Sequence, residues 1–257
     1  MKLIDTHAHL DLLKDPAGAF ARAQEAGVGQ VITIGIDLES SRKAADFTRE
    51  MRGVFCTVGL HPHEASRATP ETWAEMKLLA LTASAVAVGE CGLDFYRDLS
   101  PRHQQRDAFR AQIEMALDLG LPLVVHDREA HAEVMAMLGK YGAERVGGVV
   151  HCFSGDAAMA KELVAMGFCI GVTGVITYKK SGALRKLVKQ VPLTKILIET
   201  DCPYLSPQPH RSKPNEPAHV SLVNQALAEA LGLPPEEVAQ TTADNARRLF
   251  GLPYLGD

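Results

Sequence analysis

Eight short apolar runs rich in β-branched residues recur along this chain, and they limit its fold more than any other feature. The runs begin at Lys2, Gln30, Val54, Ala85, Leu121, Val146, Phe168 and Lys195. The stretches between them have helical spacing, and three of these stretches end at a glycine typical of a helix C-terminus: Gly27, Gly120 and Gly167. Runs that are apolar on both faces and alternate with helices are typical of buried parallel strands. Eight such units in 257 residues predict an α/β fold, the (β/α)8 TIM barrel.

The main alternative is an open, doubly wound parallel sheet. That fold usually carries a glycine-rich phosphate loop directly after its first strand. Here the sequence DTHAHLD, residues 5–11, occupies that position, which favours the barrel. Segments 219–232 and 234–251 have helical patterns, and we expect both helices to complete the outer ring. Because no linker or repeat interrupts the pattern, we expect a single domain over residues 1–257.

Composition argues against several classes of protein. Apolar residues make up 46% of the chain and charged residues 23%, which supports a sizeable core and argues against disorder. The net charge of −4 provides no global basic field, so any binding of phosphate must be local. The five cysteines form no CxxC pair and indicate reduced thiols in a cytoplasm. No secretory signal and no apolar run near the roughly 18 residues of a membrane span is evident, so we expect a cytoplasmic protein.

Histidine or a carboxylate ends five of the eight apolar runs. These residues are His7 and His9 for the first run, Glu90 for the fourth, His126 for the fifth, His151 for the sixth and Asp201 for the eighth. In a parallel barrel the carboxyl ends of all strands meet at one mouth. A single histidine of this kind is often a core residue, but the joint pattern predicts a metal centre. Imidazole with carboxylate suits Zn, Mn, Fe, Ni or Mg.

Six ligands are more than one tetrahedral ion needs, which predicts two divalent ions with Glu90 as the bridge. Strand alternation supports this set, since it places Val86, Val88 and Glu90 on one face of their strand. It likewise places Leu197, Glu199 and Asp201 on one face of theirs. The cysteines beside the predicted ligands, Cys91, Cys152 and Cys202, alternate away from the metal face and are expected to be small buried side chains.

Several polar residues near the predicted mouth are candidates for substrate binding. His61 and His63 follow the third run, and Arg128 follows His126 by two residues. The sequence HRSKPNEP, residues 210–217, follows the last run and carries Arg211 and Lys213. Segment 177–190 adds five basic residues after the seventh run. Each of these also has a structural alternative, either loop packing or a solvated surface, and the sequence leaves both open.

Five motifs in order resemble the TatD family of metal-dependent hydrolases: LIDTHAHLD, VGECGLDFYR, LVVHDREAHAEV, VVHCFSG and VPLTKILIETDCPYL. The resemblance extends from Ile4 to DNARRLFG near the C-terminus. It implies a barrel with a dinuclear site, in which His7, His9, Glu90 and Asp201 hold one ion. Glu90, His126 and His151 would then hold the other. The chain departs from the HRGKRNEP found in many members, because Ser212 and Pro214 replace a glycine and a basic residue; this weakens the case for a strong phosphate contact there.

The resemblance implies a deoxyribonuclease, a 3′–5′ exonuclease that acts on single-stranded DNA with a metal-activated water. Glu90 and Asp201 would be catalytic, with Asp201 orienting the water or accepting its proton, and His63, Arg128 and Arg211 would place the strand. We expect two divalent ions (Mg, Mn, Zn or Ni), a monomer, no membrane and no obligate protein partner. Two alternatives remain. One is a hydrolase of a small amide, lactone or ester, and the other is a metal-binding scaffold without activity.

Overall fold

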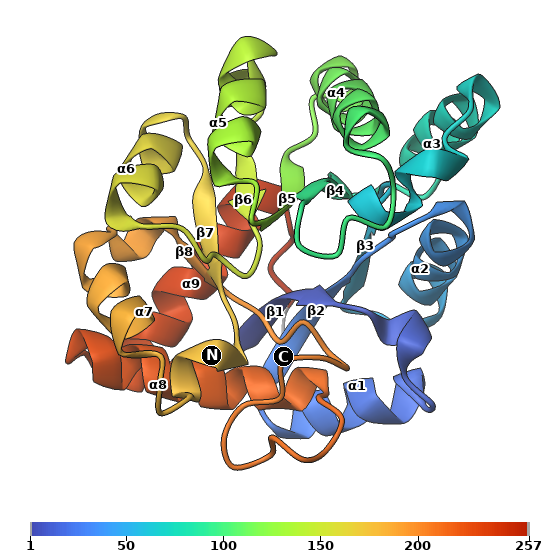
Figure 1. The fold of residues 1–257 in the computed structure, drawn as a ribbon. Helices are drawn as coiled ribbons and strands as arrows, with labels where there is room; N and C mark the ends of the chain where they lie inside the picture. The colour runs from blue at the N-terminus through green and yellow to red at the C-terminus, as the bar shows by residue number, and fades with distance from the viewer. Residues whose placement is uncertain (1, 256–257) are drawn as a thin grey trace.

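The computed structural model describes residues 2–255, in which eight parallel strands form a nearly closed barrel surrounded by helices (Figure 1). Each strand pairs with its neighbour in chain order. The strands are β1 (Leu3–Ala8), β2 (Val28–Thr33), β3 (Val54–Val58), β4 (Ala87–Asp94), β5 (Leu123–Arg128), β6 (Gly148–Val150), β7 (Cys169–Val172) and β8 (Ile196–Ile198). Each overlaps one of the eight predicted runs, so the predicted (β/α)8 barrel is confirmed.

The segment that follows β8 forms backbone hydrogen bonds with β1 and the residue after it, and these bonds close the ring of strands. Asp201 donates its backbone N–H to the carbonyl oxygen of His7 at 2.8 Å, and His9 donates to Cys202 at 2.8 Å. The Asp5 carboxylate reinforces the closure, because it accepts hydrogen bonds from the backbone N–H and the hydroxyl of Thr200 at 2.8 and 2.6 Å. The first and last strands are therefore tied together beside the residues predicted to bind metal.

Eight helices follow the strands and form the outer layer. They are α1 (Pro16–Glu25), α2 (Leu38–Glu50), α3 (Pro70–Thr82), α4 (Arg102–Leu119), α5 (His131–Lys140), α6 (Ala157–Ala165), α7 (Gly182–Leu187) and α8 (Val220–Leu231). The predicted glycine stops are confirmed, since Gly27, Gly120 and Gly167 follow helices and have φ values of +86°, +65° and +87°. None of the helices in the described part of the chain is both long enough and apolar enough to cross a bilayer.

The last helix, α9 (Pro235–Phe250), corrects one expectation. A buried apolar cluster inside the barrel includes Ile32, Val124, Val149 and Leu197 from four different strands. Ala243, Ala246 and Phe250 of α9 belong to this same inner cluster rather than to the layer between strands and helices. In Figure 1, α9 lies behind the strands. This helix therefore packs beneath the barrel interior, and the prediction that it would complete the outer ring was wrong.

Strand ends also differ from the sequence prediction. Glu90 and His126 lie within β4 and β5, whereas His9 and His151 come directly after β1 and β6. Asp201 lies three residues beyond the end of β8. All six predicted ligands nevertheless lie at the same end of the barrel, the one at which the strands end. The apolar interior lies toward the other end.

Candidate metal centre

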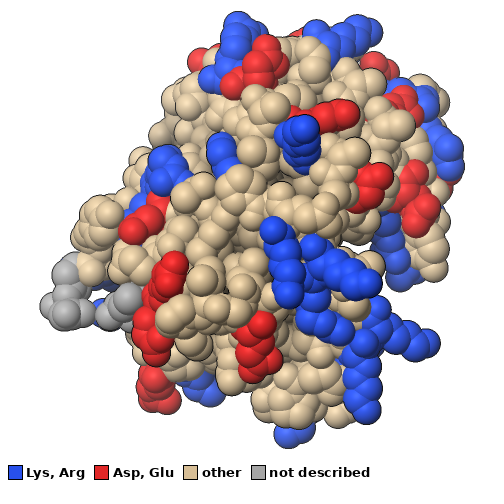
Figure 2. Space-filling model, turned by 90° about the vertical axis from the view of Figure 1, so that its left-hand side faces the viewer, with Lys and Arg blue, Asp and Glu red and all other residues tan. Residues whose placement is uncertain are grey.

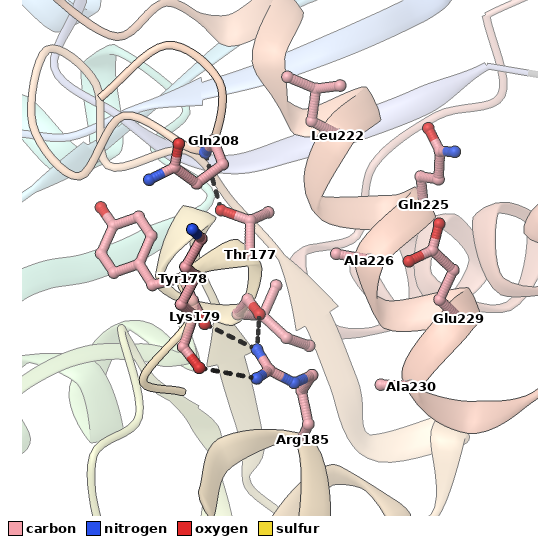
Figure 3. Close-up of a pocket in the computed structure, with 11 residues that line it drawn as sticks. Thr177, Tyr178, Lys179, Arg185, Gln208, Leu222, Gln225, Ala226, Glu229 and Ala230 are labelled. Carbon is pink, nitrogen blue, oxygen red and sulfur yellow. Dashed lines mark hydrogen bonds between the residues drawn. The ribbon is translucent and has the colours of Figure 1, made fainter. Parts of the chain in front are cut away.

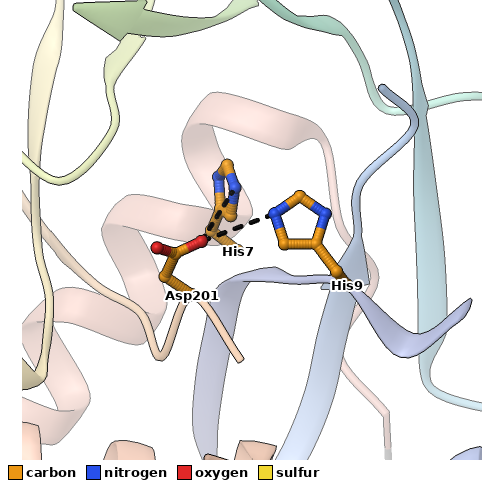
Figure 4. Close-up of side chains that lie close together, drawn as sticks. All are labelled: His7, His9 and Asp201. Carbon is orange, nitrogen blue, oxygen red and sulfur yellow. Dashed lines mark ion pairs between the residues drawn. The ribbon is translucent and has the colours of Figure 1, made fainter. Parts of the chain in front are cut away.

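The first group of side chains at the mouth joins the two ends of the chain. His7 projects from β1, His9 directly follows β1, and Asp201 approaches them from the segment after β8 (Figure 4). One oxygen of Asp201 lies 3.8 Å from Nε2 of His7 and 3.4 Å from Nε2 of His9. His7 is completely buried and His9 is 5% exposed. The predicted convergence of residues about 190 positions apart is thus present.

Glu90 lies at the middle of the site. Its Oε2 is 3.5 Å from Nε2 of His7 and 3.9 Å from Nε2 of His9. Its Oε1 is 2.8 Å from Nδ1 of His126 and 3.9 Å from Nε2 of His151. Oε1 is also 3.7 Å from Nε2 of His61. A single buried carboxylate therefore faces five imidazole rings, one oxygen toward each half of the site.

The direction of the Glu90 side chain does not follow simple strand alternation. Val88 belongs to the apolar layer between strands and helices, whereas Glu90 faces the mouth, so the prediction that they share a face was wrong. The β4–β5 register shifts between Val88 and Cys91, which breaks the alternation. Gly89 between them has a φ of +148°, and a Cβ atom there would lie 2.5 Å from the carbonyl oxygen of Val124. Only glycine permits this close approach of backbones.

Two further carboxylates orient the histidines, and the sequence prediction missed both roles. Asp94, at the end of β4, lies 2.8 Å from Nε2 of His63 and 3.2 Å from Nε2 of His126. Glu199 lies 2.9 Å from Nδ1 of His151 and accepts the backbone N–H of Cys152. Both carboxylates are completely buried. A partner on one ring nitrogen fixes the orientation in which the other nitrogen is presented to a ligand.

The buried carboxylates favour positive charge at the mouth. Burial disfavours the ionised form of Glu90, but His61 and His7 hold the pKa of this carboxyl group well below its usual range. Burial also disfavours protonated His151, yet Glu199 and Asp201 raise its pKa to about 10. The pKa of His126 rises to about 9 against the effect of burial, because Asp94 and Glu90 accept its hydrogen bonds. These shifts have the sign expected of a site that attracts cations.

The side chains fit divalent metal ions. Neither ring nitrogen of the buried His7 has a hydrogen-bond partner, nor does Nδ1 of His9. Because buried polar groups are almost always paired, these atoms point to a missing ligand. In residues 2–255, three groups of side chains bring their ligand atoms within 4.8 Å of one another: His7, His9 and Asp201; His7, Glu90 and His151; and His61, Glu90 and His126. Imidazole and carboxylate together are ligands for zinc, manganese or nickel.

Comparison with known proteins agrees with this geometry. The family model described as TatD related DNase matches residues 4–251. The chain belongs to this family. It is a TatD-type metal-dependent hydrolase whose histidine and carboxylate clusters can hold metal.

Relatives within the TatD family match over almost their whole length. YabD of Bacillus subtilis, named a metal-dependent hydrolase, is 38% identical over 97% of this chain and 99% of its own. A protein of Cronobacter sakazakii named as the 3′-5′ ssDNA/RNA exonuclease TatD is 40% identical over 90% of this chain and 89% of its own. The crystal structure of YJJV, a TatD homologue from Escherichia coli, covers 98% of each chain with a TM-score of 0.92 and 30% identity.

His61 lies among the candidate metal ligands of this TatD-type barrel. The sequence left it open between substrate contact and loop packing, but its ring lies among those of His63 and His126, with centroids 4.3 and 4.5 Å away. It is one of the three residues in the third group of candidate ligands. The signal that could have found it is its position three residues after β3, because this is the mouth end of a strand.

The three candidate substrate residues occupy the rim of the TatD-type site. His63 is partly exposed and contacts Asp94. Arg128 and Arg211 are exposed, and each guanidinium lies over a tyrosine ring, at 4.1 Å from the centroid of Tyr96 and 3.9 Å from that of Tyr178. The structure thus places these residues near the mouth, and their role stays a prediction.

Other residues singled out from the sequence have structural roles. Cys91 and Cys202 are buried in the apolar layer outside the strands, as predicted, and Cys152 contacts the Thr173 hydroxyl at 3.5 Å. In the basic segment 177–190, Arg185 donates to the carbonyl oxygens of Ile176 and Tyr178 at 2.7 and 2.9 Å. This arginine holds a loop, whereas Lys179 and Lys180 are exposed.

Proposed function

We propose that this TatD-type hydrolase is a 3′–5′ exonuclease that cleaves phosphodiester bonds at the ends of single-stranded DNA. The observation that carries the proposal is the position of Glu90 between two groups of ligand atoms, one on each of its oxygens. Such a carboxylate suits a pair of divalent ions, which is the arrangement typical of enzymes that hydrolyse phosphodiesters. The Cronobacter relative, which is named as an exonuclease, supports the same class of substrate.

The two ions would share Glu90. His7, His9 and Asp201 would complete one position, and His126 and His151, with His61 adjacent, would complete the other. When bound, the ions would supply Lewis-acid stabilisation of charge on the phosphoryl oxygens and lower the pKa of water. Glu199 and Asp94 would hold the rings of His151 and His126 in the orientation that binding requires.

Asp201 is the residue that we assign to proton transfer. Its side chain is 14% exposed, so it is open to the mouth while Glu90 and His7 are covered. A carboxylate at the edge of the site can orient the attacking water and accept its proton as the bond to phosphorus forms. His63, Arg128 and Arg211 would bind the phosphates that flank the reacting group, and guanidinium groups are suited to this contact.

A hydrolase of small amides, lactones or esters is the second candidate, because the same cluster polarises a carbonyl group. The departure at Ser212 and Pro214 from the basic loop of many family members favours it. Arg211 and Lys213 separate the two possibilities, since a phosphate-free substrate does not need them. Charge reversal at both, R211E with K213E, should weaken cleavage of DNA severely and spare hydrolysis of a neutral ester.

The test is an activity screen after metal removal and reconstitution. The substrates are single-stranded DNA labelled at its 5′ end, matched RNA, a phosphodiester dye and an ester dye, each with Mg, Mn or Zn. We expect a ladder that shortens from the 3′ end of the DNA and depends on added metal. Rapid ester hydrolysis with intact DNA would reject the nuclease, and activity equal to that of the Asp201→Asn variant would point to a contaminating enzyme.

A further inference from the structure

Three exposed or half-exposed tyrosines surround the mouth of the barrel. Tyr96 follows β4 and is 61% exposed, and Tyr204 follows β8 and is 55% exposed. Tyr178 follows β7 and is half-buried. The chain has only five tyrosines in total, so three of them lie at one end of the molecule beside the metal centre. We call these three the rim tyrosines.

Each rim tyrosine is tied to the segment that carries a site residue. The backbone N–H of Tyr96 donates to the carboxylate of Asp94 at 3.0 Å, and Asp94 itself contacts His63 and His126. The ring of Tyr204 meets that of His9 edge to face with centroids 6.1 Å apart. Tyr96 and Tyr204 therefore lie close to residues of the candidate metal centre, and burial does not explain why these two exposed residues are aromatic.

Tyr178 is fixed from the other side of the mouth. Its hydroxyl donates to the carbonyl oxygen of Ser206 at 3.1 Å, in the loop that continues to Arg211. β4 and β7, which precede Tyr96 and Tyr178, are three strands apart in the ring of eight. The two tyrosines thus follow strands on different sides of the barrel.

Two of the rim tyrosines carry an arginine on the ring. Arg128 lies over Tyr96 at 4.1 Å and Arg211 over Tyr178 at 3.9 Å. An aromatic ring beside a guanidinium offers a flat apolar surface next to a fixed positive charge. Proteins that bind single-stranded nucleic acid use this combination, because bases stack on the ring while phosphates meet the charge.

The surface beside Tyr178 continues this chemistry. Tyr178, Thr177, Lys179 and Gln208 line one wall of a groove of about 490 Å³, and α8 forms the facing wall (Figure 3). The exposed basic residues of this region include Lys179, Lys180, Arg211 and Lys213. Figure 2, which views this side of the molecule, shows Lys and Arg side chains gathered along one edge. A chain of phosphates that leaves the mouth past Tyr178 would meet positive charge, although the whole protein has a net charge of −4.

We propose that the rim tyrosines are stacking platforms for the bases of a single strand. Tyr204 serves the nucleotide beside the metal centre, and Tyr96 and Tyr178 serve bases on the two sides of it. This inference rests on the proposed nuclease function and adds to it the basis of strand selection. Paired bases cannot reach the rings, so a duplex is disfavoured, while every base has a π face, so sequence preference is weak.

The experiment compares two substrates that have the same charge. One is a short oligothymidylate, and the other is a strand of equal length whose sugars carry no bases. The measured quantity is kcat/KM for the oligothymidylate divided by kcat/KM for the strand without bases. This ratio is measured for the holoenzyme and for the variants Tyr96→Ala, Tyr178→Ala and Tyr204→Ala. Because one stacked base contributes substantially to binding, each alanine variant should lower this ratio by about 5- to 150-fold.

Conservative and distant variants separate stacking from other effects. Tyr96→Phe, Tyr178→Phe and Tyr204→Phe keep the ring and should keep the ratio. Tyr254 is the matched control, since it is 76% exposed and also pairs with an arginine, Arg247 at 4.5 Å, but it follows α9 at the other end of the barrel. Tyr254→Ala should therefore leave the ratio at the holoenzyme value.

The outcomes are distinct from those of the proposed function. If the holoenzyme cleaves oligothymidylate but the alanine variants keep its ratio, the rim tyrosines are not stacking platforms. The same conclusion follows if the phenylalanine variants fall as far as the alanine variants, because hydroxyl contacts would then explain the loss. If the holoenzyme hydrolyses only the ester dye, the nuclease proposal itself has failed, and this inference fails with it.

Discussion

Asp201 combines an unusual backbone with a central position. Its φ of +58° lies in the left-handed region, its N–H bonds to the carbonyl of His7, and its carboxylate faces His9. Asparagine tolerates this backbone as well as aspartate does. The Asp201→Asn substitution should therefore preserve the fold and one ligand oxygen while it removes the proposed base.

We predict that Asp201→Asn lowers kcat by about 10²- to 10⁴-fold, the usual contribution of a general base, with KM little changed. Steady-state kinetics and elemental analysis of the bound metal check this. The exposed Asp107 provides the isosteric control Asp107→Asn, which should be neutral. A loss of less than about tenfold with full metal content would show that Asp201 is not the base, and His63 would be tested next.

Glu199 provides a second prediction at the scale of one residue. It is completely buried and accepts from both His151 and the backbone of Cys152. Glu199→Gln keeps the shape but removes the charge that orients the His151 ring. Such outer partners typically contribute about 10- to 100-fold in metal affinity, so we expect a loss of this size in a competition assay with a metal chelator. Unaltered affinity would mean that the His151 ring is held by packing alone.

The sequence predicted most of the side chains that the structure brings together in the candidate site, but not the outer carboxylates that contact the histidines. His126 and His151 follow the inward-facing Val124 and Val149 by two residues, so alternation places them correctly. Glu199 acts on a histidine 48 residues away, and no local pattern reveals such a contact. Glu90 does not follow strand alternation, because the register shift beside Gly89 turns its side chain toward the mouth. Glu90 could be identified from the sequence as a candidate ligand, whereas its orientation depends on the partner strand.

At the scale of elements, α9 determines the closed end of the barrel. An amphipathic pattern predicts that a helix buries one face, but it does not say against which surface. The apolar face of α9 carries Ala243, Ala246 and Phe250, and it packs on the inner side chains of the strands. This is why the sequence predicted the helix correctly and placed it wrongly.

The position of α9 predicts a specific loss of stability. Phe250 is 4% exposed and belongs to the inner cluster, so Phe250→Ala should destabilise the protein by about 3–5 kcal/mol in denaturant unfolding. Glu237 lies exposed in the first turn of the same helix, and Glu237→Ala should change stability by less than about 0.5 kcal/mol. Equal effects of the two substitutions would contradict the packing of α9 beneath the barrel.

At the scale of the whole molecule, the candidate metal centre joins distant parts of the chain. Its candidate ligands come from β1 and the residue after it, the segment after β3, β4, β5, the residue after β6 and the segment after β8. No unfolded chain can present these side chains together, so an ion that binds here binds only the folded protein. Ligand binding of this kind stabilises the fold in proportion to the logarithm of ion concentration.

Metal removal should therefore lower Tm. At a free ion concentration about 100-fold above Kd, one site contributes about 2.7 kcal/mol. In a chain of this size that corresponds to a shift of roughly 5–10 °C in calorimetry. The His7→Ala/His9→Ala double variant should fold, lose about one metal equivalent and show a smaller shift. A Tm that does not respond to chelation, with metal shown to be removed, would contradict the coupling.

The overall architecture was predictable because each of the eight runs is apolar on both faces. Both faces are buried only when helices cover the outside of the barrel. The way in which the ring closes was not predictable. It depends on Asp5, Thr200 and Asp201, whose hydrogen bonds connect residues nearly 200 positions apart. The single domain over residues 1–257 remains a prediction of the sequence.

The hydrogen bonds between β1 and the segment after β8 join residues that are synthesised at different times. About 190 residues separate His7 from Asp201, and a ribosome adds roughly 5–20 residues per second, so the second ligand emerges roughly 10–40 s after the first. Until then His7 and His9 lack the carboxylate that completes their group. A nascent chain that has not yet reached Asp201, next to messenger RNA, therefore has an incomplete candidate centre. Competence for hydrolysis is therefore expected only after the last strand and the segment that carries Asp201 have been synthesised.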